Sequence, residues 1–152
     1  YVFDDGPDFE GSGFLVPPID DTFIKAATVA SNKWTWVAAS GRTVIRASVG
    51  RAGEATLLQS DDADITTRAL ADLRTAFGGL PEPLDSRVQR WGGGLPQYTV
   101  GHLERVDTIE RGLANVRGLE VCGAAYRGVG IPAVIASGQA AALRLLGGTM
   151  DS

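Results

Sequence analysis

The sequence contains one cysteine, Cys122, and one histidine, His102, among 152 residues. A single cysteine excludes an internal disulfide, and so few soft ligands leave no spaced set for a structural zinc ion. No stretch approaches the ~20 apolar residues that a bilayer span needs, and the first residues lack the charged-then-apolar pattern of a signal peptide. These absences predict a cytoplasmic protein with no metal site and no transmembrane segment.

Basic charge is also scarce. Lys and Arg number 14 against 18 Asp and Glu, which gives a formal net charge of −4. No run of basic residues interleaves with aromatic residues, so nucleic acid and anionic lipid are disfavoured as partners. Apolar residues make up 44% of the chain, which is enough for the core of one domain or for pieces of two.

A set of side chains for nucleophilic catalysis is missing as well. An activated serine or cysteine needs a base within reach. His102 stands at the predicted start of a helix, and Cys122 lies inside a predicted buried strand, where a thiol is an inert core group. We therefore predict no catalytic residue in this chain. A cofactor would carry the chemistry, and the protein would bind it, orient it and exclude competing reactions.

Alternating apolar residues and turn signals divide the first 92 residues into strands and one helix. We expect residues 1–11 to form a loop or a broken strand end. The predicted strands, of which the first three form an antiparallel meander, are residues 13–16, 22–30, 43–49 and 86–91. A helix is predicted over residues 62–77, because apolar residues recur there every fourth position and acids crowd its first turn. Trp34 and Trp36 are expected to pack on the sheet.

Three consecutive glycines, residues 92–94, mark the predicted boundary between residues 1–92 and 93–152. Beyond it, a second amphipathic helix is predicted from His102, with Asp107 and Arg111 paired at i,i+4 on its solvated face. Its inward-facing residues are expected to be Leu103, Val106, Ile109 and Leu113. A short apolar strand at residues 119–122, a glycine-rich loop and a helix entered through Pro132 complete the chain.

The glycine-rich loop, residues 123–130, is the leading candidate site. A helix that begins with proline exposes backbone N–H groups and the positive end of its dipole, which suits an anion or the polar edge of a cofactor. Residues 128–133 fit the letters of a dinucleotide fingerprint. However, its glycines follow the strand too late, and the only acid in range is Asp151, at the end of the chain. We interpret the loop as one wall of a cofactor pocket that is completed elsewhere.

Two stretches are specific to a known family: RWGGGLPQYTVGH at residues 90–102 and GAAYRGVGIP at residues 123–132. Further matches are GSGFLVP (residues 11–17), NKW (32–34) and TVIRASVGRAGE (43–54). On these motifs the chain resembles the C-terminal third of bacterial flavin-dependent porphyrinogen oxidases, which belong to the amine-oxidase-like flavoproteins. It departs from many relatives at Ala133 and Val134, where they have Asp and Cys, and at Arg127, where an acid is common.

The resemblance implies an α/β fold that would be α+β as an isolated segment. Residues 1–92 would supply an antiparallel sheet with a helix from the substrate-binding domain. Residues 93–152 would supply the last helix–strand–helix of a Rossmann-type FAD-binding domain. The resemblance also implies that Val129, Gly130 and Ile131 bring backbone amides to the pyrimidine edge of the flavin, with Gly123 in the same cofactor-binding loop and Trp91 near the flavin.

The implied activity is the FAD- and O2-dependent oxidation of coproporphyrinogen III, or of protoporphyrinogen IX, to the porphyrin in haem synthesis. The family's diphosphate-binding G-x-G-x-x-G unit is absent from these 152 residues. We therefore expect the N-terminal portion of the same protein to be their partner and the segment alone to be inactive. An alternative of a different class is a non-catalytic ligand-binding or assembly module that pairs with a separate N-terminal chain.

Overall fold

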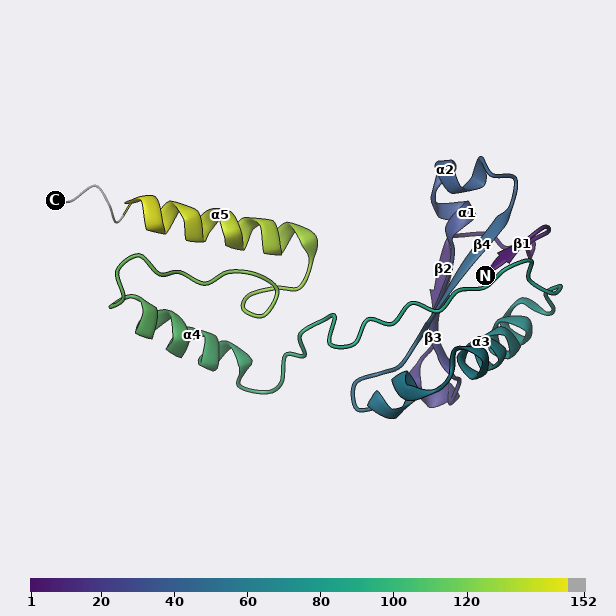
Figure 1. The fold of residues 1–152 in the computed structure, drawn as a ribbon, viewed down its shortest axis with the longest axis horizontal. Helices are drawn as coiled ribbons and strands as arrows, with labels where there is room; N and C mark the ends of the chain where they lie inside the picture. The colour runs from purple at the N-terminus through teal and green to yellow at the C-terminus, as the bar shows by residue number, and fades with distance from the viewer. Residues whose placement is uncertain (148–152) are drawn as a thin grey trace. The chain divides into compact units, whose positions relative to one another are not determined.

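The computed structural model describes residues 1–147, so Asp151 lies outside the described residues. The chain divides into two compact units, Tyr1–Gly92 and a second that begins at Gly93 (Figure 1). The division falls within the run of three glycines. The assignment of the two units to a substrate-binding and an FAD-binding domain stays a prediction.

The first unit is built on a four-stranded antiparallel sheet in the order β1-β4-β3-β2. Its strands are β1 (Val2–Phe3), β2 (Gly13–Leu15), β3 (Ile24–Val29) and β4 (Thr43–Val49). The three strands of the predicted meander are confirmed. Of the two alternatives expected for residues 1–11, a loop or a broken strand end, the second fits β1, whose two residues are too few to show a periodicity.

A register shift between Ile24 and Ala26 decides which side chains of β3 reach the core. Ile24, Ala27 and Val29 are all buried, although strict alternation would place Ile24 on the opposite face from the other two. The irregularity inserts one extra position in the strand and returns Ile24 to the core face.

Helix α3 (Asp62–Phe77) packs on β3 and β4 and closes the core of this unit (Figure 1). The predicted helix is confirmed at both ends, and it stops at Gly78, which has a φ of 71°. The Tyr1 hydroxyl donates to the Thr66 carbonyl oxygen over 2.7 Å, and burial raises the pKa of this phenol to about 12. The fully or largely buried core residues are Phe3, Ile24, Ala27, Ile45, Ala69, Leu70 and Leu73.

Two predictions for the first unit are wrong. Trp34 and Trp36 do not pack on the sheet: they lie in and between the short helices α1 (Ala30–Lys33) and α2 (Thr35–Ala38), and are 49% and 76% exposed. Residues 86–91 form no strand. Asp85 makes a single bridge to Val2, and the two-residue strand β1 offers the following residues no further ladder. Two short 3-10 helices, Pro18–Asp20 and Ala55–Gln59, complete the unit.

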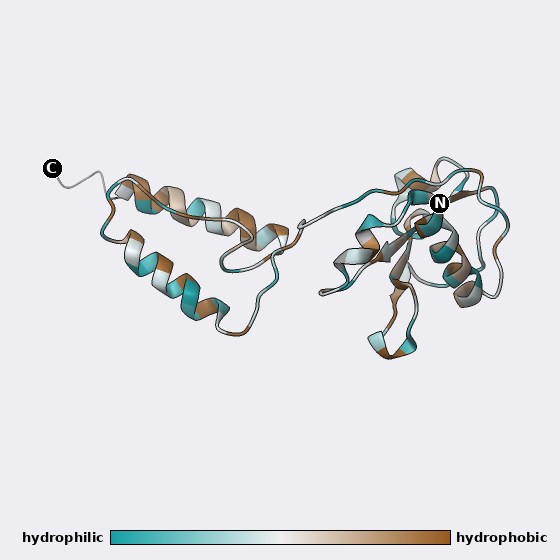
Figure 2. Ribbon diagram, turned by 60° about the horizontal axis from the view of Figure 1, so that its bottom comes forward, coloured by the Kyte–Doolittle hydropathy of each residue, from teal (hydrophilic) through white to brown (hydrophobic). Residues whose placement is uncertain are grey.

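The second unit consists of helices α4 (His102–Leu113) and α5 (Ile131–Gly147), which lie side by side in both ribbon views (Figures 1 and 2). Both helices are confirmed. The strand predicted at residues 119–122 is wrong: that segment is irregular, and Cys122 is exposed rather than buried. Within residues 93–147 there is no second strand to pair with it, and a lone extended segment has no partner for its N–H and C=O groups.

The apolar face predicted for α4 is only partly covered. Val106 is buried at 2% exposure, whereas Leu103 and Ile109 are 57% and 44% exposed. Figure 2 shows apolar residues along α5 too, of which Ala141 is buried while Ile135 and Leu143 are exposed. For residues 1–147, the helices all fall short of the length or apolar content that crossing a membrane requires.

Candidate functional site

The glycine-rich loop, residues 123–130, connects the irregular segment after α4 to the first turn of α5. Gly123 opens it with a φ of 110°, a conformation that favours glycine, and its N–H donates to the Ser137 hydroxyl oxygen over 2.8 Å. Ser137 lies inside α5, so the start of the loop is attached to the helix that the loop leads into. This hydrogen bond holds the start of the loop against α5.

Gly128 occupies the tightest position of the loop. Its φ is 129°, and a Cβ atom placed there would lie 2.8 Å from the Cβ of Ala133. Both the backbone conformation and the close approach to α5 therefore demand glycine at this position. Gly130 is different, because a Cβ there would meet nothing nearer than the Pro132 Cδ at 3.9 Å and its φ is ordinary.

The backbone N–H groups of Val129, Gly130 and Ile131 find no acceptor among residues 1–147. The first hydrogen bond of α5 runs from the Val134 N–H to the Gly130 carbonyl oxygen over 3.0 Å, so the positive end of the helix dipole faces the same place. Val129 and Ile131 are 44% and 77% exposed. Unpaired donors flanked by exposed apolar side chains fit the polar edge of a flat heteroaromatic ring, such as that of a flavin.

Tyr98, in the segment before α4, and His102, the first residue of α4, hold the middle of the loop. The Tyr98 hydroxyl accepts a hydrogen bond from the Gly128 N–H over 2.7 Å and donates to the Ala124 carbonyl oxygen over 2.6 Å. His102 Nε2 lies 2.7 Å from the Tyr126 carbonyl oxygen, and the Tyr98 and His102 rings stack. Neither Tyr98 nor Ser137 was predicted as a site residue. The signal for Tyr98 was its place in the motif RWGGGLPQYTVGH.

Arg127, one of the departures from the family pattern, points its guanidinium at helix α4. It forms ion pairs with Asp107 and with Glu110, the latter at 2.6 Å. The predicted pairing of Asp107 with Arg111 is therefore replaced, and Arg111 instead donates to the Thr108 hydroxyl oxygen over 3.2 Å. The acids of α4 attach this part of the loop to the helix.

The Arg127 guanidinium, chiefly through its hydrogen bond, holds the pKa of the Glu110 carboxyl below its ordinary value of 4.5. At pH values above the ordinary pKa, the ion pair that lowers the pKa of Glu110 stabilises the fold. This stabilisation is lost as the pH falls through the lowered pKa. We expect Arg127→Gln to return the pKa of Glu110 toward 4.5, measured by NMR titration of its side chain. Arg111→Gln is the matched control and should leave that pKa in place. An unchanged pKa in Arg127→Gln would contradict the assignment.

The remaining predicted site residue, Trp91, belongs to the first unit, whereas Gly123, Val129, Gly130 and Ile131 all belong to the second. Its side chain is 77% exposed. Across residues 1–147, His, Cys, Asp and Glu side chains form no cluster that could hold a metal ion.

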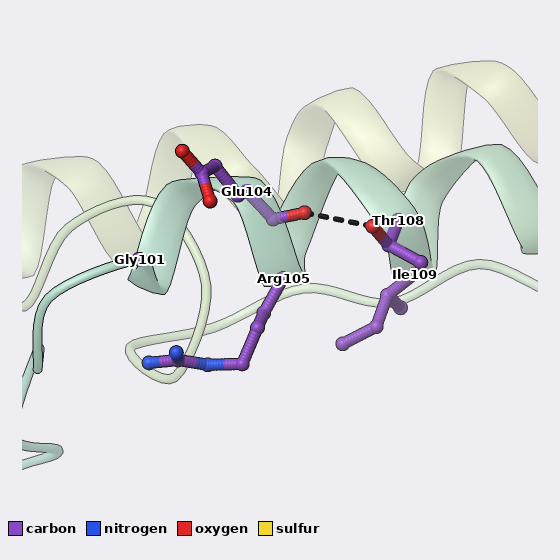
Figure 3. Close-up of a pocket in the computed structure, with 5 residues that line it drawn as sticks. All are labelled: Gly101, Glu104, Arg105, Thr108 and Ile109. Atoms are coloured by element: carbon purple, nitrogen blue, oxygen red, sulfur yellow. Dashed lines mark hydrogen bonds between the residues drawn. The ribbon is translucent and has the colours of Figure 1, made fainter.

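Figure 3 shows an open hollow on α4, lined by Gly101, Glu104, Arg105, Thr108 and Ile109. Its walls come from one helix and the residue before it, and the Thr108 hydroxyl donates back to the Glu104 carbonyl oxygen over 2.8 Å. Polar groups from other elements do not converge on it, as they do in a ligand pocket. The glycine-rich loop is therefore the better candidate.

Unpaired backbone amides at the start of a helix suit an anion or the polar edge of a cofactor. The model of the family described as flavin containing amine oxidoreductase matches residues 16–146. The chain therefore belongs to the flavin-containing amine oxidoreductase family, and a flavin is the cofactor of that family.

Two curated relatives are similar to this chain over most of its length. The chain is 38% identical over 133 residues to the coproporphyrinogen III oxidase of Bacillus subtilis strain 168, covering 87% of this chain and 28% of that protein. It is 31% identical over 134 residues to the coproporphyrinogen III oxidase of Staphylococcus aureus, covering 88% of this chain and 29% of that one. The chain thus spans less than a third of the length of the relatives it matches.

A solved structure agrees with this fold. The crystal structure of a candidate protoporphyrinogen oxidase from Exiguobacterium sp. 255-15 is similar with a TM-score of 0.79 and 37% sequence identity. The similarity covers 91% of this chain and 31% of that one. The expected fold class, helices combined with an antiparallel sheet as in part of a flavin-containing amine oxidoreductase fold, is confirmed.

Proposed function

We propose that the whole protein to which these residues belong is an FAD-dependent oxidase that converts coproporphyrinogen III to coproporphyrin III with O2. The observation that carries the proposal is the set of unpaired N–H groups at Val129, Gly130 and Ile131, placed at the start of α5. Identities of 38% and 31% to two coproporphyrinogen III oxidases support the choice of substrate. The low cysteine content is compatible with activity in the cytoplasm.

A flavin held there would supply the redox chemistry: each electron pair removed with its protons from the porphyrinogen would be passed to one O2, which leaves as one H2O2. The amides of Val129, Gly130 and Ile131 would face the pyrimidine edge of the ring, where reduction concentrates negative charge. Oriented backbone donors and the dipole of α5 stabilise that charge without having to reorganise. Trp91 would lie near the flavin, and the first unit would cover the substrate.

The test is to express the whole polypeptide, purify it and measure both its flavin content and its oxidation of porphyrinogens in air. Porphyrin fluorescence and H2O2 release follow the reaction. We expect bound FAD and a higher kcat/KM for coproporphyrinogen III than for protoporphyrinogen IX. A polypeptide that carries no flavin and leaves coproporphyrinogen III unchanged would overturn the proposal.

The 152-residue chain by itself is expected to form no porphyrin. It carries the amides for one edge of the flavin but no unit for its diphosphate, so the cofactor would be held by only part of its contacts. The measurement is porphyrin fluorescence after incubation with coproporphyrinogen III and added FAD, with the whole protein as the positive control. Porphyrin formation above the rate without protein would contradict this expectation. Flavin-free pairing of the chain with a separate N-terminal polypeptide would instead favour an assembly module.

A further inference from the structure

One hydroxyl group joins two positions of the glycine-rich loop. The Tyr98 hydroxyl oxygen accepts from the Gly128 N–H over 2.7 Å, and its proton goes to the Ala124 carbonyl oxygen over 2.6 Å. The two contacts use the hydroxyl as both acceptor and donor. The hydrogen bond at Gly128 immediately precedes the residues whose N–H groups are unpaired, so it determines the path of the backbone into them.

The imidazole of His102 stacks on the Tyr98 ring. The two ring centroids are 3.8 Å apart with an interplanar angle of 11°. His102 Nε2 lies 2.7 Å from the Tyr126 carbonyl oxygen. A carbonyl oxygen can only accept, so Nε2 carries the proton of this hydrogen bond. The pair therefore holds the loop at three consecutive even-numbered residues, namely Ala124, Tyr126 and Gly128.

Packing alone does not account for this arrangement. Tyr98 is 41% exposed, so burial of its ring does not determine its position. The loop around it is irregular and has no regular backbone ladder of its own. The conformation of the loop therefore depends on directed hydrogen bonds, which specify orientation better than apolar contact does.

We propose that Tyr98 and His102 are positioning residues for the cofactor: they hold residues 124–128 so that the N–H groups of Val129, Gly130 and Ile131 are aimed at the flavin edge. This inference rests on the proposed function. Loss of the Tyr98 hydroxyl leaves the Gly128 N–H without its partner and frees the following amides to turn away. The reduced flavin then loses more binding free energy than the oxidised flavin does, because the negative charge is on the reduced form.

The decisive variant is Tyr98→Phe in the whole protein, which keeps the ring and its stacking on His102. We expect its preference for reduced over oxidised flavin to fall about tenfold, which lowers the two-electron reduction potential of the bound flavin by about 30 mV. Tyr1→Phe is the matched control, because it also removes a hydroxyl that donates to a backbone carbonyl, that of Thr66. Its flavin potential should equal that of the unchanged protein.

A second pair of variants decides the question if Tyr98→Phe does not fold. His102→Ala removes the donor to Tyr126 and should lower the potential, whereas His102→Gln retains an N–H donor and should restore at least half of the difference. Equal potentials in Tyr98→Phe and the unchanged protein, or an equal shift in Tyr1→Phe, would overturn the inference. So would equal potentials in the two His102 variants. Failure of the proposed function is distinct, because the unchanged whole protein would then bind no flavin at all.

Discussion

Replacing Gly128 by alanine is expected to weaken flavin binding by the whole protein about a hundredfold. A φ of 129° is strained for any residue with a side chain, and the new methyl group would lie 2.8 Å from the Ala133 Cβ. Strain of this kind costs up to about 3 kcal/mol, which corresponds to roughly two powers of ten in affinity. The loop or the first turn of α5 must shift to relieve it. Flavin fluorescence titration measures the dissociation constant.

Two further glycines serve as controls for this experiment. Gly112 lies in α4 with an ordinary φ and open space around its Cβ position, so Gly112→Ala should leave flavin affinity unchanged. Gly130→Ala is sterically acceptable to the protein itself, because the nearest atom is 3.9 Å away. Loss of flavin in Gly130→Ala would therefore report the close approach of the cofactor rather than strain in the loop. Normal flavin affinity in Gly128→Ala would show that the loop does not hold the cofactor.

The second large effect is expected from Leu73→Ala, which should lower the free energy of unfolding of the first unit by about 3 kcal/mol. Leu73 is completely buried, and its cluster includes Phe3, Ile45 and Ala69. Truncation removes apolar burial and leaves a cavity between α3 and the sheet. Urea unfolding followed by circular dichroism measures the difference.

Leu15→Ala is the matched control for the core variant. Leu15 lies in β2 and is 84% exposed, so its truncation should change stability by no more than about 0.5 kcal/mol. Equal losses in the two leucine variants would show that the cluster around Leu73 is not the core of this unit.

The elements that could be predicted from the sequence are those whose signals are local. Helix α3 has apolar residues at helical spacing, acids in its first turn and Gly78 after its last residue. Strand β4 was predicted over residues 43–49 from its alternation, and Ile45, Ala47 and Val49, at alternate positions, contact the core. In such segments the chain's own pattern and its tertiary partners favour the same structure.

The predictions that failed concern segments whose structure depends on a partner. Residues 119–122 are apolar enough for a strand, but the second unit provides no neighbouring strand within the described residues. Strand β1 is the converse case, since a two-residue segment becomes a strand only by pairing with Val44 and Thr43. Trp34 and Trp36 sit at alternate positions, yet short helical turns place them in solvent.

By itself, the sequence determined the glycine-rich loop, the helix that follows it and the division of the chain at the three glycines. These features follow from residues that act locally: glycine permits a positive φ, and proline begins a helix. Only the tertiary structure decided how the loop is held, because the contacts join residues far apart in the sequence. Ser137 and Tyr98 bind loop residues that lie 14 and 30 positions away, and Arg127 in the loop pairs with Glu110 of α4 across 17 positions. Such side-chain contacts carry no periodic signal, since they depend on how α4 and α5 bring distant backbone groups together.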